Sequence, residues 1–323
     1  MTDAGQSPTA PRPTVLFVLG MARSGTSALT RTLSLCGGTL PAGMVGRSRG
    51  NPLGFWEPRR VVQLNLAILR RHGSPFFDPS LRLQQEGAFD AEEKAICIAE
   101  ITALLTTLPA APLVVIKEPA ITALSAMWFE AARVAGFDVA TVTAVRHPQE
   151  VIASLGKSGT KTSPELAGAL WLKYNLLAER DTRGLPRVFV EYANLLDDWR
   201  REVQRISAAL AIDLNTRDED AIEEFLTHDL RHQRQSDAVT EPFGTDWISV
   251  VYEALRAAAR DEPWDGSALD RAFEAYQASE QGFRKVFEEF RRLQKLDRFN
   301  WPPLTGRALE VVAMAHRRKG TWA

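Results

Sequence analysis

The amino-acid sequence predicts an α/β protein in which helices flank a parallel β-sheet and a helical extension follows at the C-terminal end. Runs of β-branched residues alternate with helical patterns up to about residue 215, as crossover connections of a parallel sheet require. Beyond Phe225 the pattern contains no convincing strand. We therefore expect a tail at 1–13, an α/β domain at 14–235 and a helical extension at 236–323 that packs on this domain.

The periodicity of apolar residues predicts each element in turn. The expected strands are Val15–Leu19, Leu113–Lys117, Val139–Val145 and Arg187–Tyr192. The expected helices are Ser27–Cys36, Arg59–Arg71, Ala91–Leu108, Ile121–Ala135, Pro148–Leu155, Pro164–Arg180 and Asn194–Leu210. No periodicity appears from Leu40 to Phe55, and a loop of that length in a compact domain is usually functional or mobile.

The composition of the 323 residues is that of a globular protein, with 39 basic and 40 acidic side chains and a net charge of −1. Such a balance creates no field that would attract nucleic acid. Cys36 and Cys97 lie in apolar helical patterns and are interpreted as buried thiols in a reducing compartment. Residues 1–13 lack the pattern of a signal peptide, and no apolar run approaches the roughly 18 residues of a membrane span. The expectation is a cytoplasmic protein without a transmembrane segment.

The C-terminal part is polar and irregular from Thr227 to Thr245 and then contains two helical patterns. The second pattern, about Leu269–Leu296, carries apolar residues at nearly heptad spacing. We interpret it as a helix that packs its apolar stripe on the main domain. A homodimer seam is the less favoured alternative, because Glu280 interrupts the stripe and the run is short for a coiled coil.

The first functional motif follows the strand Val15–Leu19. Its spacing, Gly20-x4-Gly25-Thr26-Ser27, half-matches the phosphate-binding loop Gly-x4-Gly-Lys-Ser/Thr. A strand, a tight loop and a helix N-terminus together bind phosphate through backbone N–H groups and the helix dipole. Thr26 stands where the lysine would be, and the positive charge is at Arg23. The loop is predicted to bind a phosphate-bearing ligand other than ATP with magnesium; the alternative is an ordinary strand–helix turn.

The second motif follows the strand Val139–Val145. Arg146 ends this strand, Pro148 suits the first turn of a helix, and Ser154 lies about two turns into that helix. An arginine and a hydroxyl placed in this way can bind one phosphate from two sides. Parallel sheets bind ligands at the carboxyl edge, where the first loop also lies. The two motifs therefore predict a ligand with two separated phosphate-like groups.

These two motifs together resemble the sulfotransferase family that uses 3′-phosphoadenosine 5′-phosphosulfate (PAPS), whose fold is related to that of the P-loop NTPases. Four further segments are similar to bacterial members, and the resemblance spans about 14–235: Asn51–Glu57, Val115–Pro119, Trp171–Asn175 and Val190–Leu196. The resemblance implies that the 5′-phosphosulfate end is bound by Arg23, Ser24, Gly25, Thr26 and Ser27. It implies Arg146 and Ser154 at the 3′-phosphate.

The same resemblance suggests the groups that act on the acceptor. Glu57 is the first choice for the base that removes the acceptor's proton, and it follows aromatic residues that could shield it from water. The alternative for Glu57 is a first-turn helix carboxylate, and the competing base is His72. Lys117 resembles a lysine that assists the leaving group in some carbohydrate sulfotransferases, and Arg23 is the third candidate catalytic residue. The chain departs from bacterial relatives at Ala120, where those proteins tend to carry arginine.

Two basic segments and several aromatic residues remain without an assigned role. The segment Arg231–Arg234 could contact the cofactor's phosphate or form a solvated loop, and Arg317–Gly320 is interpreted as a frayed tail. The apolar walls of an acceptor pocket could come from Phe55, Trp56, Phe76, Phe77 and Trp247. These side chains would suit a lipid, a sugar ring or an aryl alcohol.

The leading hypothesis is therefore transfer of a sulfuryl group from PAPS to a hydroxyl of a small molecule, carbohydrate or glycolipid, without a metal. One alternative is a P-loop kinase or NTPase. It would need the loop lysine and an acidic magnesium ligand at the end of a strand, whereas Asp138 begins its strand. The other alternative is a non-catalytic nucleotide-binding protein.

Overall fold

A computed structural model describes residues 12–47, 51, 53–157, 162–216, 218–226 and 239–297, with the backbone alone at 285, 287 and 290–297. Contacts divide the chain into two compact units, Met1–Phe273 and Glu274–Ala323, each described by itself. The strands are β1 (Thr14–Leu19), β2 (Leu113–Lys117), β3 (Asp138–Val145) and β4 (Arg187–Glu191). The α-helices are α1 (Thr26–Leu35), α2 (Arg59–Arg71), α3 (Ala91–Leu105), α4 (Ser125–Val134), α5 (Pro148–Gly156), α6 (Pro164–Asp181), α7 (Tyr192–Asp197), α8 (Trp199–Leu210), α9 (Glu219–Phe225), α10 (Trp247–Ala258) and α11 (Gly266–Asp297). Two short 3-10 helices are η1 (Arg82–Gln84) and η2 (Pro119–Leu124).

The four strands form one parallel sheet in the order β2-β1-β3-β4. The register pairs Val18 of β1 with Lys117 of β2 and Leu19 of β1 with Thr143 of β3. The carboxyl ends of these three neighbouring strands therefore meet at one edge, where parallel sheets bind their ligands. The expected α/β architecture with helices at the C-terminal end is confirmed.

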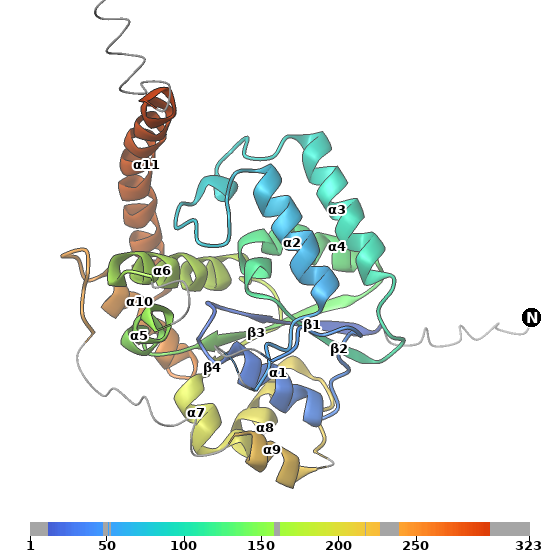
Figure 1. The fold of residues 1–323 in the computed structure, drawn as a ribbon. Coiled ribbons are helices and arrows are strands. Elements are labelled where there is room, and N and C mark those ends of the chain that lie inside the picture. Colours follow the sequence, from blue (N-terminus) through green and yellow to red (C-terminus); the bar gives the residue numbers. More distant parts are fainter. Residues whose placement is uncertain are drawn as a thin grey trace, which may run out of the picture. The chain divides into compact units, whose positions relative to one another are not determined.

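The alternating side chains of β1 contribute to both layers of the core. Val15, Phe17 and Leu19 pack with residues of α2, α3 and α4, whereas Leu16 and Val18 pack with residues of α1 and α8. Figure 1 shows these two sets of helices on opposite faces of the sheet. Since side chains of a strand alternate between faces, a strand that is covered on both sides must be apolar throughout. Each such buried side chain contributes about 1.5–3 kcal/mol.

The expected helix Asn194–Leu210 is wrong as a single element. The chain forms α7 and then α8, because Asp198 leaves the helical conformation at φ −150° and caps α8. Its carboxylate accepts a hydrogen bond from the backbone N–H of Arg201 at 3.0 Å. Aspartate at such a position satisfies an N–H group that otherwise has no partner, which favours a new helix start over continuation.

The helix expected at Ala91–Leu108 ends three residues earlier, at Leu105, and several other expected ends differ by one residue. Two of the differences change the type of element. The strand expected to end at Tyr192 ends one residue earlier, and Tyr192 begins α7. The helix expected at Ile121–Ala135 is divided into η2 and α4, because Leu124 adopts φ −117° and ψ 15° between them. An apolar segment this short shows too little periodicity to predict such a break from the sequence.

The remaining expectations either fall on residues outside the described ones or are not tested by the structure. Residues 231–234 and 317–320 lie outside the described residues. The second unit contains the C-terminal part of α11, and the homodimer seam through its apolar stripe stays a prediction. The domain limit at 235 also stays a prediction. Among the helices that are described, none combines the length and apolar character needed to cross a bilayer.

Candidate functional site

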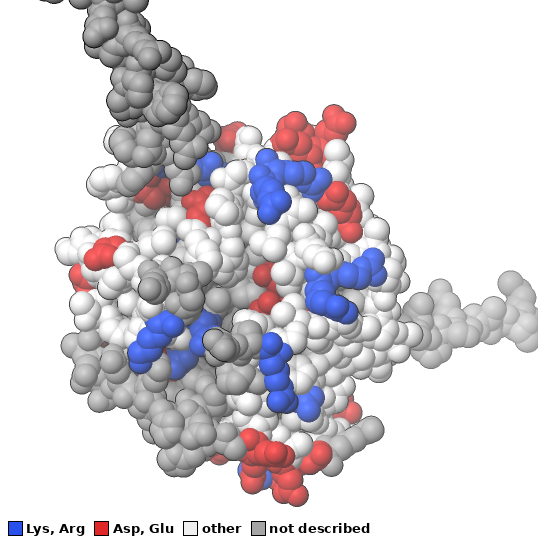
Figure 2. Space-filling model, viewed as in Figure 1, with Lys and Arg blue, Asp and Glu red and all other residues white. Residues whose placement is uncertain are grey.

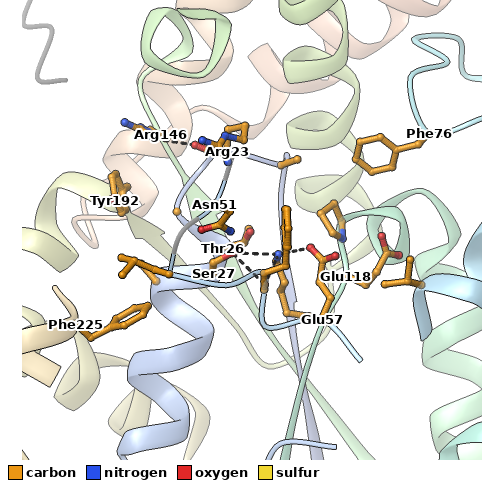
Figure 3. A pocket seen from close by; sticks show the side chains of 18 of the residues that line it. Arg23, Thr26, Ser27, Asn51, Glu57, Phe76, Glu118, Arg146, Tyr192 and Phe225 are labelled. Atoms are coloured by element: carbon orange, nitrogen blue, oxygen red, sulfur yellow. Dashed lines mark hydrogen bonds and ion pairs between the residues drawn. The ribbon is translucent and has the colours of Figure 1, made fainter. Parts of the chain in front are cut away.

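A pocket of about 380 Å³ opens at the carboxyl edge of β1, β2 and β3. The corresponding face of the molecule is hollowed at its middle, and acidic atoms are visible inside the hollow (Figure 2). The close view shows Arg23 and Arg146 at one end of the pocket and Glu57 and Glu118 at the other, with Thr26 between them (Figure 3). One end thus presents guanidinium groups and the other presents carboxyl groups.

Two glycines allow the loop between β1 and α1 to pack tightly. Gly20 has φ +115°, and a Cβ there would lie 2.6 Å from the carbonyl oxygen of Ala144 in β3. Gly25 has φ +87°, and its Cβ would lie 2.2 Å from Cδ2 of Tyr192. Both the backbone angle and the close neighbour therefore exclude other residues. The first glycine fits the loop to the sheet, and the second fits it to α7.

The loop presents the start of α1 to the pocket. Gly25 is the N-cap of this ten-residue helix and provides no side-chain cap, and the first helical bond joins the N–H of Leu29 to the carbonyl of Gly25. The N–H groups before that bond have no partner inside the helix. Ser24 is fully buried, and its hydroxyl has no hydrogen-bond partner among the described residues. Such a helix start can hold an anion.

The basic end of the pocket joins the two sequence motifs. The Nε of Arg23 donates to the hydroxyl of Ser154 at 2.8 Å, across 131 positions of sequence. Arg146 donates through one guanidinium nitrogen to the carbonyl of Arg23 at 2.9 Å and through Nε to Glu150 at 2.7 Å. The guanidinium of Arg146 also lies over the ring of Tyr192, with its central carbon 4.6 Å from the ring centroid.

Electrostatics at this end favour an anion. Burial lowers the pKa of Arg23, and the positive charge of Arg146 lowers it further. Arginine still keeps its proton at neutral pH. Two like charges held close together repel, and a bound dianion would relieve that repulsion. This end is therefore suited to a phosphate group.

The side chain of Lys117 connects the loop to the acidic end. Its Nζ donates to the carbonyl of Phe55 at 3.0 Å and to a carboxylate oxygen of Glu57 at 2.5 Å. The hydroxyl of Ser27 lies 3.4 Å from the same nitrogen and donates to the carbonyl of Phe55 at 3.0 Å. Only 3% of the Lys117 side chain and 13% of the Glu57 side chain are exposed, so this ion pair is largely shielded from water.

The backbone at Trp56 gives Phe55 and Glu57 their positions. Trp56 has φ +57°, a conformation that is costly for a bulky side chain. Its indole N–H donates to the carbonyl of Leu53 at 3.1 Å, and the guanidinium of Arg31 lies 4.6 Å from its ring centroid. These contacts hold the turn that lets Phe55 and Glu57 both reach Lys117. Trp56 itself is not among the described residues that line the pocket.

Glu118, the residue after Lys117, lines the same pocket and is 5% exposed. Its carboxylate accepts a hydrogen bond from the amide of Asn65, whose oxygen accepts one from the indole N–H of Trp128 at 2.9 Å. Burial raises the pKa of Glu118 to about 7; the Asn65 hydrogen bond opposes this shift, whereas the negative charge of Glu57 adds to it. A buried carboxyl beside another one is expected to hold its proton to higher pH.

The raised pKa of Glu118 predicts a pH-dependent stability. Because the pKa of about 7 in the folded protein exceeds the ordinary 4.5, the folded state holds the proton more tightly. The resulting stabilisation of about 3 kcal/mol is fully present below about pH 4.5 and is lost as the pH rises through about 7. Position 118 does not titrate in Glu118→Gln, so this variant does not lose that stabilisation as the pH rises. The free energy of unfolding of the variant minus that of wild type should therefore increase between about pH 5 and about pH 8.

Urea unfolding at a series of pH values measures this difference. Glu92→Gln, at an exposed carboxyl in the first turn of α3, serves as the control and should show no comparable rise. A difference between Glu118→Gln and wild type that stays constant with pH would contradict the buried, protonated carboxyl.

Some of the residues predicted to form the apolar walls line the pocket, and others do not. Phe55 and Phe76 line it, whereas Phe77, Trp247 and His72 are not among the described lining residues. His72 ends α2 and stacks on Phe89, with ring centroids 4.1 Å apart. Within the described part of the chain, no group of three or more His, Cys, Asp or Glu side chains is arranged to hold a metal ion.

Tyr192 and Glu118 are among the pocket residues that were given no site role by the sequence reasoning. Tyr192 packs against both Gly25 and Arg146, although the sequence placed it only in a supporting segment. Glu118 stands between an apolar strand and Pro119, next to a predicted catalytic lysine. A charged residue at the carboxyl end of a buried strand is itself a signal of a ligand site, and that signal could have identified Glu118.

Comparisons with solved structures find similar folds at low identity. The sulfotransferase domain from the curacin biosynthetic pathway has 15% identity and a TM-score of 0.41, covering 78% of this chain and 99% of that one. The sulfotransferase domain from the Synechococcus PCC 7002 olefin synthase has 19% identity and a TM-score of 0.41, covering 84% and 97%. Sulfotransferase STF1 from Mycobacterium tuberculosis H37Rv has 16% identity and a TM-score of 0.35, covering 75% and 76%. No protein-family model and no curated protein matches the sequence.

Proposed function

We propose that this protein transfers a sulfuryl group from PAPS to a hydroxyl of a small-molecule, carbohydrate or glycolipid acceptor, without a metal. The observation that carries the proposal is the hydrogen bond between Arg23 and Ser154. It unites the two phosphate motifs at one end of a pocket whose other end holds a buried lysine and Glu57. A two-ended anionic donor and a hydroxyl acceptor match this distribution of charge.

The donor groups of the basic end fit the phosphates of such a cofactor. Arg23, Arg146 and Ser154 supply guanidinium and hydroxyl donors at a single place. The buried hydroxyl of Ser24 and the start of α1 supply further donors. The resemblance implied Arg23 at the 5′ end, but because Arg23 reaches Ser154 we instead assign it to the 3′-phosphate together with Arg146. We assign the start of α1 to the 5′ end. Paired guanidinium groups suit a phosphate dianion.

The acidic end fits the acceptor. When bound, PAPS supplies a sulfuryl group that passes to the acceptor oxygen as its bond to the 5′-phosphate oxygen breaks. Glu57 removes the acceptor's proton, which raises the nucleophilicity of that oxygen. Lys117 lies between Glu57 and the hydroxyl of Ser27 on the phosphate loop, so its ammonium group can stabilise the charge on the departing oxygen.

Binding of adenosine 3′,5′-bisphosphate tests the basic end directly. The nucleotide should raise the melting temperature in the absence of metal, and ATP with magnesium should not. Arg146→Ala should weaken nucleotide binding by about 100-fold, because an arginine that contacts phosphate loses both its charge and its paired donors. Isothermal titration calorimetry measures the affinity, and the melting temperature without ligand shows that the variant folds.

The matched control is Arg183→Ala. Arg183 is also ion-paired at helical spacing, to Glu179 at 2.6 Å, and it does not line the pocket. It should leave nucleotide affinity unchanged. Stabilisation by ATP with magnesium but not by the bisphosphate would favour a kinase or NTPase and overturn the proposal. Bisphosphate binding without sulfuryl transfer from labelled PAPS to any alcohol of a broad panel would favour a non-catalytic nucleotide-binding protein.

A further inference from the structure

The acidic end of the pocket contains a second carboxyl group that is not part of the ion pair between Lys117 and Glu57. Lys117 is hydrogen-bonded to Glu57, Ser27 and the carbonyl of Phe55. Glu118 instead accepts hydrogen bonds from the uncharged amide of Asn65 and from the backbone N–H of Ala120, and the positive charge of Lys117 offsets the effect of its burial only in part. An ionised carboxylate in a buried wall is costly unless a charge or a ligand compensates it.

The surroundings of Glu118 hold it in one position. Asn65 comes from α2 and is fully buried, and Trp128 comes from α4 and is also fully buried. The chain of hydrogen bonds from indole to amide to carboxylate therefore ties together three separate elements. A buried polar network of this kind fixes the orientation of its members. Glu118 is thus a rigid part of the pocket wall.

Apolar side chains complete the wall near Glu118. Val62, Leu66 and Phe76 line the same pocket, and Figure 3 shows Phe76 on the side of Glu118, away from Arg146. Lys117 and Glu57 together are neutral as an ion pair, so Glu118 decides whether this end is neutral or negative. An acceptor with a negative group close to its hydroxyl would meet a like charge in a poorly hydrated place.

We propose that Glu118 forms part of the acceptor site and selects against acceptors that carry an anionic group near the reacting hydroxyl, favouring uncharged or cationic alcohols with an apolar face. This inference rests on the proposed sulfuryl transfer, because it identifies the acidic end as the acceptor side. Glu118 acts here as a specificity-determining residue, and Glu57 keeps the role of base. No proton or sulfuryl group passes to Glu118.

The charge of Glu118 also makes the selection depend on pH. Among the described residues, the titratable groups that face it are Glu57 and Lys117 in the pocket and Tyr174 of α6, whose pKa is raised chiefly by burial and also by Glu118. A tyrosine with a raised pKa does not titrate near neutrality. Discrimination against an anionic acceptor should therefore increase as the pH rises through the range where Glu118 loses its proton.

The test compares two probes of nearly the same size and shape, one neutral and one anionic. para-Hydroxybenzamide and para-hydroxybenzoate share the ring and the hydroxyl, and their affinities are measured by calorimetry on the protein saturated with adenosine 3′,5′-bisphosphate. At about pH 8 the wild type should bind the amide at least about tenfold more tightly than the carboxylate. Glu118→Gln should bring the two affinities to within about twofold of each other. The ratio of amide affinity to carboxylate affinity should be smaller at about pH 6 than at about pH 8 in wild type, and it should not change with pH in Glu118→Gln.

Asp181→Asn is the matched control. Asp181 is a partly buried carboxyl with a pKa raised by burial, it accepts from the neutral hydroxyl of Ser125, and it does not line the pocket. It should leave the ratio of affinities unchanged. Equal binding of both probes to wild type, a ratio that survives in Glu118→Gln, or failure of both probes to bind would overturn the proposal. The titration with adenosine 3′,5′-bisphosphate is made first. If the nucleotide does not bind, the proposed sulfuryl transfer is contradicted, and not only the role of Glu118.

Discussion

Replacing Glu57 with glutamine is expected to lower kcat for sulfuryl transfer by about 10²–10⁴-fold, because the amide cannot accept the acceptor's proton. Adenosine 3′,5′-bisphosphate should bind with unchanged affinity, since the arginines that we propose to contact it lie at the opposite end of the pocket. The variant also leaves the buried Lys117 without its carboxylate partner, which is expected to reduce the free energy of unfolding by several kcal/mol. Turnover is measured with the best acceptor of the alcohol panel, at a temperature where the variant is folded.

A second ion pair with a buried carboxylate provides the control for this loss of stability. Glu179 is 2% exposed and pairs with Arg183 at 2.6 Å outside the pocket. Glu179→Gln should destabilise the protein in a comparable way and retain kcat. If Glu57→Gln kept near wild-type turnover, the base would have to be another group, and loss of activity in His72→Asn would then identify the competing histidine.

Replacing Gly25 with alanine is expected to reduce both stability and nucleotide binding. The new methyl group would lie 2.2 Å from the ring of Tyr192, in addition to the strain of φ +87°. Together these are expected to cost about 2–4 kcal/mol of unfolding free energy. Because Arg146 lies over the same ring, displacement of Tyr192 should also weaken the binding of adenosine 3′,5′-bisphosphate by at least about tenfold.

A substitution at Gly184 distinguishes the strain of a positive φ from the clash with a neighbouring side chain. It has φ +79°, nearly the same backbone conformation, and a Cβ there would meet no atom within 4 Å. Gly184→Ala should therefore lose only about 1 kcal/mol and leave nucleotide binding intact. Urea unfolding and calorimetry measure the two quantities. Equal destabilisation by both substitutions would show that the loop can move away from Tyr192, contrary to the tight packing described here.

Local patterns were sufficient for most of the fold. An apolar β-branched run marked β1, and a proline followed by an apolar period marked α5, because both signals depend only on neighbouring residues. The break at Asp198 was missed, since the capping aspartate lies inside a stretch with continuous helical periodicity. The divided segment around Leu124 was missed for a different reason, because its residues are buried on all sides and show no clear period.

The candidate site was predictable where its residues belong to a motif and not where they meet through folding. Arg23 and Ser154 could each be selected from their own segments, but their hydrogen bond depends on β1 and β3 being neighbours. Glu118 gained its importance from Asn65 and from Glu57, which come from other parts of the chain. The burial that raises its pKa cannot be read from adjacent residues.

By itself, the sequence determined the α/β class and predicted a phosphate-binding loop whose positive charge is carried by Arg23 in place of a lysine. Both are local properties, because periodicity and loop chemistry are set by residues close together in the chain. Only the tertiary structure decided that Arg23 lies against Ser154, that Lys117 is bound to Glu57, and that Glu118 is a buried carboxyl. These contacts depend on strand order and on burial, which the packing of distant segments creates.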